Sequence, residues 1–232
     1  MSALDSVSTR RPIKFLRRLL RPAPLGPMRR MKPLSDCWGY DRGNPADRYY
    51  IEHFLESHRT DIRGHALEVK DSTYIDRYGT GIERVDILDR DSGNPHATIL
   101  ADLSAADPIA SDSFDCFVLT QTLQLIYDVR AAVVHAHRIL RPGGVLLVTV
   151  PCISKIAWEP GASDCWRFTA ASCSLLFGGC FGAENVSVRP YGNMLTAIAF
   201  LLGMAQEELS PKELDVHDES FPVIVGVRAI KR

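Results

Sequence analysis

Acidic side chains stand in three successive apolar runs, where their carboxylates could accept hydrogen bonds from one ligand. Glu68 lies in ALEV (66–69), Asp86 in VDIL (85–88) and Asp102 in ATILADL (97–103). Any one of them alone is most simply explained as a solvated residue at a strand end. Three at the ends of neighbouring parallel strands would meet at one sheet edge, where open α/β folds bind ligands. The pattern therefore predicts a single binding site.

The elements that would position these carboxylates are clearest over residues 114–151. FDCFVLT (114–120) is continuously apolar apart from Asp115, which is typical of a strand buried on both faces of a parallel sheet. VRAAVVHAHRIL (129–140) has the apolar stripe of an amphipathic helix, and VLLVTVP (145–151) is a second buried strand. Strand, helix and strand in this order predict a right-handed crossover in a doubly wound, mostly parallel sheet.

The flanking segments complete the predicted domain. A helix in ADRYYIEHFLESH (46–58) follows from the helical spacing of Ile51, Phe54 and Leu55, with Asn44 as its cap and Pro45 in its first turn. Alternating segments in the last third predict antiparallel partners. The remaining expected elements are a loop (151–168), a helix ending at Gly178-Gly179 (171–181), two antiparallel strands (185–192 and 221–231) and an apolar helix (194–209).

Residues 1–34 form a separate, basic tail in this interpretation, and residues 35–232 form the folded domain. Residues 1–32 carry nine basic residues and one acid, so the rest of the chain has a net charge of −9. An acidic body is a poor candidate for nucleic-acid binding, and none is expected. The segment IKFLRRLLR (13–21) fits a short helix on an anionic membrane, with peripheral contact through residues 10–32, but a solvated flexible tail is the simpler interpretation.

Composition favours a globular cytoplasmic protein. The six cysteines include no CxxC pair, so reduced thiols and no metal site are expected. No apolar run approaches the roughly 18 residues that span a bilayer, and we expect no secretory signal. The oligomeric state is not predicted.

The block FDCFVLTQTLQLIYDVRAAVVHAHRILRPGGVLLVTVP (114–151) resembles the fourth strand, helix and fifth strand of class I S-adenosylmethionine (SAM)-dependent methyltransferases, in particular the type 11 group. Arg138 keeps an arginine of that helix, and DCWRFT (164–169) resembles a further element of the group. The resemblance covers about residues 42–231. It implies a Rossmann-like sheet of seven strands with a C-terminal antiparallel hairpin, with SAM across the carboxyl edge.

The resemblance also implies roles for individual residues. Glu68 would stand at the first-strand motif, and Asp86 would accept hydrogen bonds from the ribose hydroxyls, with Asp89 as the alternate. Asp102 and Leu103 would frame the adenine. Thr120 and Gln121 would line the pocket after the fourth strand.

One departure from the family pattern concerns the loop after Glu68. The family has a glycine-rich sequence there, whereas this chain has Lys70-Asp71-Ser72-Thr73-Tyr74. Glycines let the backbone approach a ligand closely. Either the loop takes another path, with Asp71 or Ser72 capping a short helix and Tyr74 or Arg77 replacing lost contacts, or the site no longer holds SAM.

The expected activity is methyl transfer to a small-molecule or glycan acceptor, at oxygen. An oxygen acceptor benefits from a general base, for which Asp164 and Tyr127 are weak candidates. Trp166, Arg167 and Phe168 are candidates for walling the acceptor pocket. Residues that could cover the site from the N-terminal side are Arg42, Asp47, Tyr49 and Tyr50.

Two alternatives belong to other classes of function. A catalytically inactive methyltransferase-like binding or partner module would explain the lost glycines. A nicotinamide-dependent oxidoreductase is disfavoured, because no G-x-G-x-x-G follows a strand.

Overall fold

The computed structural model describes residues 19–20, 26–157 and 164–232. The chain divides into two units, residues 1–33 and residues 34–232, and the second holds the sheet and its helices. Most of the segment 13–21, for which a membrane-surface helix is one interpretation, lies outside the described residues. Peripheral membrane contact through residues 10–32 therefore stays a prediction.

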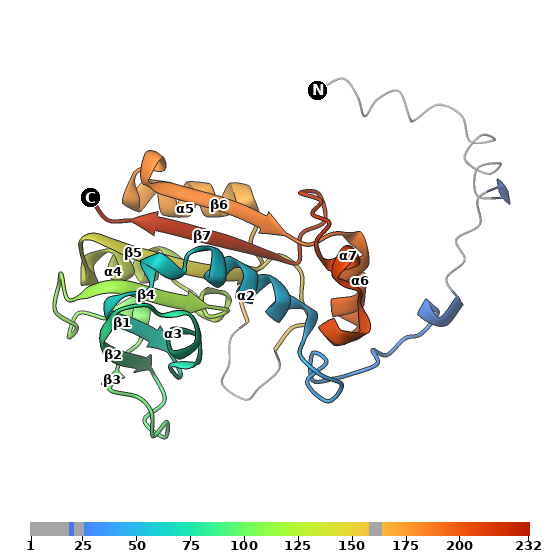
Figure 1. Cartoon of the computed structure of the whole chain (residues 1–232), viewed down its shortest axis with the longest axis horizontal. Helices are drawn as coiled ribbons and strands as arrows, with labels where there is room; N and C mark the ends of the chain where they lie inside the picture. Colours follow the sequence, from blue (N-terminus) through green and yellow to red (C-terminus); the bar gives the residue numbers. More distant parts are fainter. Residues whose placement is uncertain (1–18, 21–25, 158–163) are drawn as a thin grey trace. The chain divides into compact units, whose positions relative to one another are not determined.

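Seven strands form one sheet in the order β3-β2-β1-β4-β5-β7-β6 (Figure 1). The pairs β3–β2, β2–β1, β1–β4 and β4–β5 are parallel, whereas β7 runs antiparallel to both β5 and β6. This confirms the predicted Rossmann-like, mostly parallel sheet with an antiparallel C-terminal pair. The strands are β1 (Gly64–Val69), β2 (Ile82–Asp89), β3 (Ile99–Leu100), β4 (Phe114–Thr120), β5 (Leu140–Pro151), β6 (Val186–Tyr191) and β7 (Ile224–Ile230).

Helices cover both faces of the sheet and enclose a separate core on each (Figure 1). Residues of α2 and α3 join one core, to which α6 and α7 contribute at the far end of the sheet. Residues of α4 and α5 join the other core. The helices are α2 (Ala46–Ser57), α3 (Thr73–Tyr78), α4 (Val129–Ile139), α5 (Ala170–Phe181), α6 (Met194–Leu202) and α7 (Pro211–Leu214).

The central strands are buried on both faces, as their continuous apolar runs predict. Along β4, Phe117 and Leu119 belong to the core under α4 and α5, whereas Cys116 and Val118 belong to the opposite core. All four side chains are fully buried. Alternate residues of one strand thus point to opposite faces, and both faces are apolar because helices cover both.

Two helices end at other positions than predicted, and glycine conformation explains both corrections. Helix α5 continues through Gly178-Gly179 to Phe181, because the left-handed residue that ends it is Gly182, at φ 84°. The helix predicted over 194–209 ends at Leu202, where Gly203 adopts φ 73°. A side chain at Gly203 would lie 2.5 Å from the carbonyl oxygen of Ser35, so this turn also brings residues 34–35 against α6.

The start of α2 and the third strand also differ from prediction. Asn44 does not cap α2: the N-cap is Pro45, and no side chain caps it. The backbone of Asn44 instead pairs with the segment 206–207, whose Gln206 amide donates to the Asn44 carbonyl. The strand expected over 97–103 is only Ile99–Leu100, because Asp102 caps a 3-10 helix at Leu103–Ala105.

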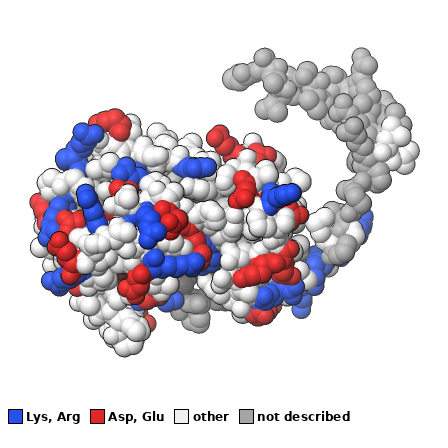
Figure 2. Space-filling model, viewed as in Figure 1, with Lys and Arg blue, Asp and Glu red and all other residues white. Residues whose placement is uncertain are grey.

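Charges of both signs are interspersed on the face of the domain in Figure 2. Several ion pairs join elements that are distant in the chain. Arg228 of β7 binds the Asp61 carboxylate through two nitrogens at 2.7 and 2.9 Å, and Arg77 of α3 binds Glu52 of α2 at 2.8 Å. None of the helices in the described part of the chain has the length and apolarity to cross a bilayer.

Close packing of α2 on β7 gives a test of the fold. A Cβ at Gly226 of β7 would lie 2.7 Å from the Phe54 ring of α2. We expect Gly226→Ala to lower the free energy of unfolding by about 1–3 kcal/mol through overpacking, measured by urea denaturation. The control is Gly179→Ala in α5, where an added Cβ meets no atom within 4 Å. That variant should be neutral or stabilised by up to about 1 kcal/mol, and an equal loss in both variants would contradict the packing.

Candidate functional site

A cavity of about 990 Å³ opens at the carboxyl edge of the parallel strands. Its position is the one that open α/β sheets use for ligands. Its walls come from the β1–α3 loop, the end of β2, the turn after β3, the end of β4 and one face of α2. Lining residues include Tyr40, Arg48, Glu52, Glu68, Lys70, Asp71, Tyr74, Arg77, Asp89, Asp102, Leu103, Thr120, Gln121 and Tyr127.

Glu68 organises the loop at the centre of this site. Its carboxylate oxygens accept hydrogen bonds from the backbone amides of Tyr74 and Ile75, at 3.1 and 2.8 Å. These amides belong to the first turn of α3 and have no partner within the helix. Burial raises the pKa of Glu68 to about 8, although the two amide hydrogen bonds oppose the shift. Glu68 thus lies at the cavity, but its oxygens hold the loop and helix in place.

The loop after Glu68 keeps a glycine-like backbone without glycine. Lys70 adopts φ 77°, in the left-handed region that glycine enters most easily. Its amide donates to the Leu88 carbonyl at 3.0 Å, and its carbonyl accepts from the Asn94 side chain at 2.7 Å. The predicted cap is partly correct, since Asp71 accepts from the Thr73 amide at 2.9 Å, whereas Ser72 makes no capping hydrogen bond.

The second strand places Asp89, and not Asp86, at the cavity. Strand β2 extends to Asp89, so Asp86 lies inside it and is absent from the lining. Asp86 is bound by His65, Arg84 and Thr98 at distances of 2.7–3.0 Å, which makes it a structural residue. The ribose role was predicted for Asp86 with Asp89 as the alternate, and the alternate is the carboxylate that lies at the edge.

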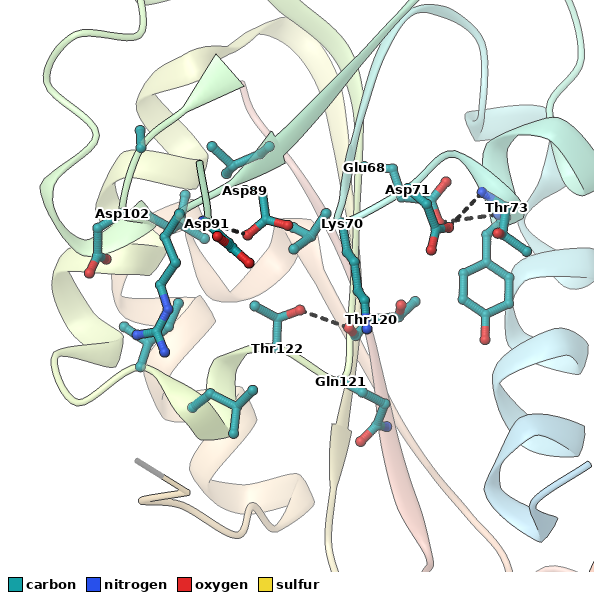
Figure 3. A pocket seen from close by; sticks show the side chains of 18 of the residues that line it. Glu68, Lys70, Asp71, Thr73, Asp89, Asp91, Asp102, Thr120, Gln121 and Thr122 are labelled. Carbon is teal, nitrogen blue, oxygen red and sulfur yellow. Dashed lines mark hydrogen bonds between the residues drawn. The ribbon is translucent and has the colours of Figure 1, made fainter. Parts of the chain in front are cut away.

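Asn94 connects two parts of the cavity wall, the loop at Lys70 and the end of β2 at Asp89. Its side-chain nitrogen donates to the Lys70 carbonyl and to the Asp89 carboxylate, both at 2.7 Å. Figure 3 shows Asp89 and Asp91 between Asp102 on one side of the pocket and Lys70 on the other. Sequence reasoning missed Asn94, although its place in the turn-rich stretch after Asp89 is a signal for such a bond.

Asp102 and Leu103 both line the cavity, as predicted. Asp102 accepts hydrogen bonds from the amide and the hydroxyl of Ser104, at 2.8 and 2.7 Å. Leu103 is buried and presents an apolar surface beside that carboxylate. The turn after β3 therefore offers one polar and one apolar contact to a flat ligand group.

Thr120 and Gln121 also reach the cavity, at the end of β4 (Figure 3). Gln121 has a left-handed backbone, φ 46°, and its amide donates to the Thr149 carbonyl at 2.8 Å. Its side-chain nitrogen is buried and has no hydrogen-bond partner among the described residues. Left-handed non-glycine backbone and an unpaired buried donor are both features of functional sites.

Of the two candidate bases, only Tyr127 lies at the cavity. Tyr127 lines the cavity, and its side chain is exposed. Asp164 is absent from the lining and binds Arg167 and the Ala157 amide. Partial burial works against ionisation, but the Arg167 hydrogen bonds hold the pKa of Asp164 below its ordinary value. Such a paired carboxylate is a weak base, so the structure disfavours Asp164 in that role.

The residues predicted to cover the site from the N-terminal side do not line the cavity, whereas neighbouring residues on the same elements do. Tyr50 is buried in the core, Tyr49 donates to Asp215, and Arg42 pairs with Glu208. Asp47 is buried and is absent from the cavity lining. The α2 side chains that do line the cavity are Arg48 and Glu52, which share the face one turn apart.

Residues 166–168 do not line the cavity. Phe168 belongs to the core under α4 and α5, and Arg167 is held by Asp164. Trp166 donates to the Ile126 carbonyl at 3.0 Å and lies near the Tyr127 ring. This segment therefore supports the wall from outside. Among the described residues, no cluster of three His, Cys, Asp or Glu side chains is placed to hold a metal ion.

Comparison with known proteins agrees with this geometry. Residues 62–148, from before β1 into β5, match the family model described as methyltransferase domain, of the type 11 group. No curated protein sequence matches the chain. The predicted resemblance to class I SAM-dependent methyltransferases is confirmed, in sequence over residues 62–148 and in fold by solved structures.

Solved structures share the fold at low identity. A SAM-dependent methyltransferase from Archaeoglobus fulgidus is 9% identical, with a TM-score of 0.52, over 79% of this chain and 94% of that one. A second, from Mesorhizobium loti, is 16% identical, also with a TM-score of 0.52, over 76% and 95%. The [4+2]-cyclase SpnF is 15% identical over 87% of each chain, again with a TM-score of 0.52. Because a cyclase has this fold too, the fold alone does not fix the reaction.

The buried carboxyl of Glu68 predicts a pH effect on stability. Its pKa near 8 in the folded protein exceeds the ordinary glutamate value of about 4.3, so folding favours the protonated acid. Its contribution is complete below about pH 4 and is lost as pH rises to about 8. Relative to Glu68→Gln, which cannot ionise, the wild type should lose stability across this range. Urea midpoints of both proteins at several pH values measure this, and a constant difference would contradict it.

The left-handed backbone of Lys70 predicts a contrast between two substitutions. Lys70→Gly removes a side chain that disfavours φ 77°, whereas Lys70→Ala keeps the unfavourable backbone. We expect the glycine variant to be more stable than the alanine variant by about 1 kcal/mol, since left-handed backbone costs about 1–2 kcal/mol and glycine's entropy offsets part of it. Thermal unfolding compares the two. An alanine variant as stable as the glycine variant would show that the loop takes another path.

Proposed function

We propose that the protein is a SAM-dependent methyltransferase that transfers the methyl group to a small-molecule or glycan acceptor, at oxygen. The observation that carries the proposal is the series of groups along one cavity. The close-approach loop at Lys70, the Asp89 carboxylate and the Asp102-Leu103 turn follow one another along the strand ends (Figure 3). An amino acid end, a ribose and an adenine need such groups in this order.

The residues present fit that cofactor. Asp89 ends β2 and lines the cavity, where it would accept hydrogen bonds from ribose hydroxyls. Asp102 would accept from the adenine amine, while Leu103 would pack on the ring. The unpaired amide nitrogen of Gln121 would donate to the amino acid end, since a buried donor without a partner is costly.

When bound, SAM supplies a sulfonium-activated methyl group. The chain's own contribution is to position the acceptor in line with that methyl, from which much of the rate of such a displacement can come. Gln121 and Thr122, which follow β4, line the same cavity as Arg48 and Glu52 of α2. For an acceptor hydroxyl, Tyr127 in its phenolate form is the remaining candidate to take up the proton, because this exposed side chain lies at the cavity wall.

An inactive methyltransferase-like module is the second candidate. It is favoured by the side chains of Lys70 and Tyr74, which line the cavity where the family pattern has glycine. Incubation with labelled SAM and pools of candidate acceptors decides between the two. Label transfer that depends on the acceptor supports the enzyme, whereas SAM binding without transfer to any pool supports the module.

Measurements of cofactor binding distinguish the roles of Asp86 and Asp89, the two carboxylates of β2. We expect Asp89→Asn to weaken SAM binding about 10- to 100-fold, through loss of charged hydrogen bonds, as measured by calorimetric titration. Asp86→Asn is the matched control, because Asp86 lies inside β2 and outside the cavity. It should keep wild-type affinity in the folded fraction. No binding by the wild-type protein at millimolar SAM would end the proposal, and loss of affinity only in Asp86→Asn would overturn the site assignment.

A further inference from the structure

Helix α6 is apolar on the side that faces solvent as well as on the side that faces the core. Thr196 and Phe200 are buried against the domain. On the opposite stripe of the helix, Met194 is 57% exposed, and Leu195 and Leu201 are each 43% exposed. We call this stripe the α6 face, and its members are Met194, Leu195, Ile198, Leu201 and Leu202.

The α6 face has the composition of an interaction surface. The helix reads MLTAIAFLL and contains no charged residue. A helix on the surface of a domain normally has polar residues on its outer stripe, whereas one that is apolar all round is covered by protein or lipid. Single exposed leucines need no explanation, but a continuous apolar stripe marks a binding surface. Because three members of the α6 face are exposed, the described part of the chain does not cover it.

The basic tail begins at the C-terminal end of the same helix. The amides of Leu34 and Ser35 donate to the carbonyl of Leu202, at 2.6 and 3.4 Å. The chain just before them includes RRMK (29–32), and all four of these residues are exposed. Residues 1–32 together contain nine basic residues and one acid. A strongly basic segment is therefore attached to the domain at the edge of the α6 face.

Charge indicates which occupant fits the α6 face. Residues 33–232 have a net charge of −9, whereas residues 1–32 have a net charge of +8. An anionic surface would repel the acidic domain, and the basic tail offsets that repulsion. An apolar element and a basic segment are two signals that together give stable binding to an anionic membrane. A second copy of the chain fits less well, because each copy would bring a tail of the same charge to the interface.

We propose that the α6 face and the basic tail together bind the chain to the surface of an anionic lipid bilayer. The α6 face would contact the acyl chains at the interface, while the tail would contact the lipid phosphates. A helix of nine residues is about 14 Å long, so it lies along the surface and does not span it. The inference does not depend on the proposed function, because no residue of the α6 face lines the cavity.

The test is flotation of the full-length protein with vesicles of phosphatidylcholine and phosphatidylglycerol in equal parts. The wild type should float. We expect Met194→Gln with Leu201→Gln to lower the partition coefficient about 10- to 100-fold, through loss of buried apolar area. Glutamine at Arg29, Arg30 and Lys32 should lower it by a similar factor, about 10- to 100-fold, through loss of attraction to the anionic lipid.

Leu175→Gln with Val134→Gln is the matched control. Leu175 of α5 is 80% exposed and Val134 of α4 is 54% exposed, and these two helices cover the opposite face of the sheet. The control also replaces two exposed apolar side chains, and it should float like the wild type. Leu195→Gln alone should lower partition by a smaller factor. It keeps the test decisive should the double variant of α6 fold poorly.

The proposal is wrong if the wild type does not float, or if the α6 variants and the control lose partition equally. Flotation that only the tail substitutions reduce would also overturn it, because the tail would then bind without α6. Sedimentation of the lipid-free protein tests the second copy as occupant. A dimer that Met194→Gln with Leu201→Gln converts to a monomer would assign the α6 face to that copy and overturn the membrane contact.

Discussion

The hydrogen bonds from the first turn of α3 to the Glu68 carboxylate are the interaction on which the site depends. They connect the end of a central strand to the helix that follows, and they fix the path of the five residues between them. The amides at this helix end would otherwise lack partners within the helix, and the two side-chain oxygens of Glu68 supply them. Because Glu68 is buried, this connection is shielded from water and from competing partners.

The loop that Glu68 holds is also connected to its neighbour along the sheet edge. Asn94 binds the Lys70 carbonyl and the Asp89 carboxylate through one side-chain nitrogen, so the loop and the end of β2 share a partner. A loop with glycines could bend to meet a ligand. Here, Lys70 has a left-handed backbone that is hydrogen-bonded through both its amide and its carbonyl, so the loop has a preformed shape. A preformed shape reduces the conformational entropy that a loop loses when a ligand binds.

The sequence was sufficient to predict the sheet, because buried parallel strands leave continuous apolar runs that few other structures produce. Phe117 and Val118 belong to opposite cores, as the run 114–120 predicts. Strand ends were harder to predict, since the apolar run VDIL ends at Leu88, whereas β2 continues to Asp89, which still pairs with Leu100 of β3. The α2 wall was misassigned because Tyr49, Tyr50 and Arg48 are adjacent in sequence, and only the rotation of the helix decides which one faces the cavity.

Side-chain partners formed between distant segments could not be inferred from spacing. Arg48 meets Tyr40 and Tyr74 only once three separate elements are assembled. The same is true of Asp164, whose partner Arg167 converts an apparent base into half of an ion pair. Local patterns predict which groups reach the sheet edge, whereas the assembled structure determines which of them remain available to a ligand.

The turn at Gly203 contacts the segment that leads to Tyr40 and Asn44, two residues of the cavity wall, and so connects this wall to the last third of the chain. Leu34 and Ser35 donate to the Leu202 carbonyl, and Gly203 leaves no room for a side chain beside Ser35. The strand-edge carboxylates do not share this support. Substitutions in α6 could therefore shift the part of the cavity wall that carries Tyr40 and Asn44 while the strand-edge carboxylates stay in place. Such a domain could change the ligands that it binds without changing the centre of the site.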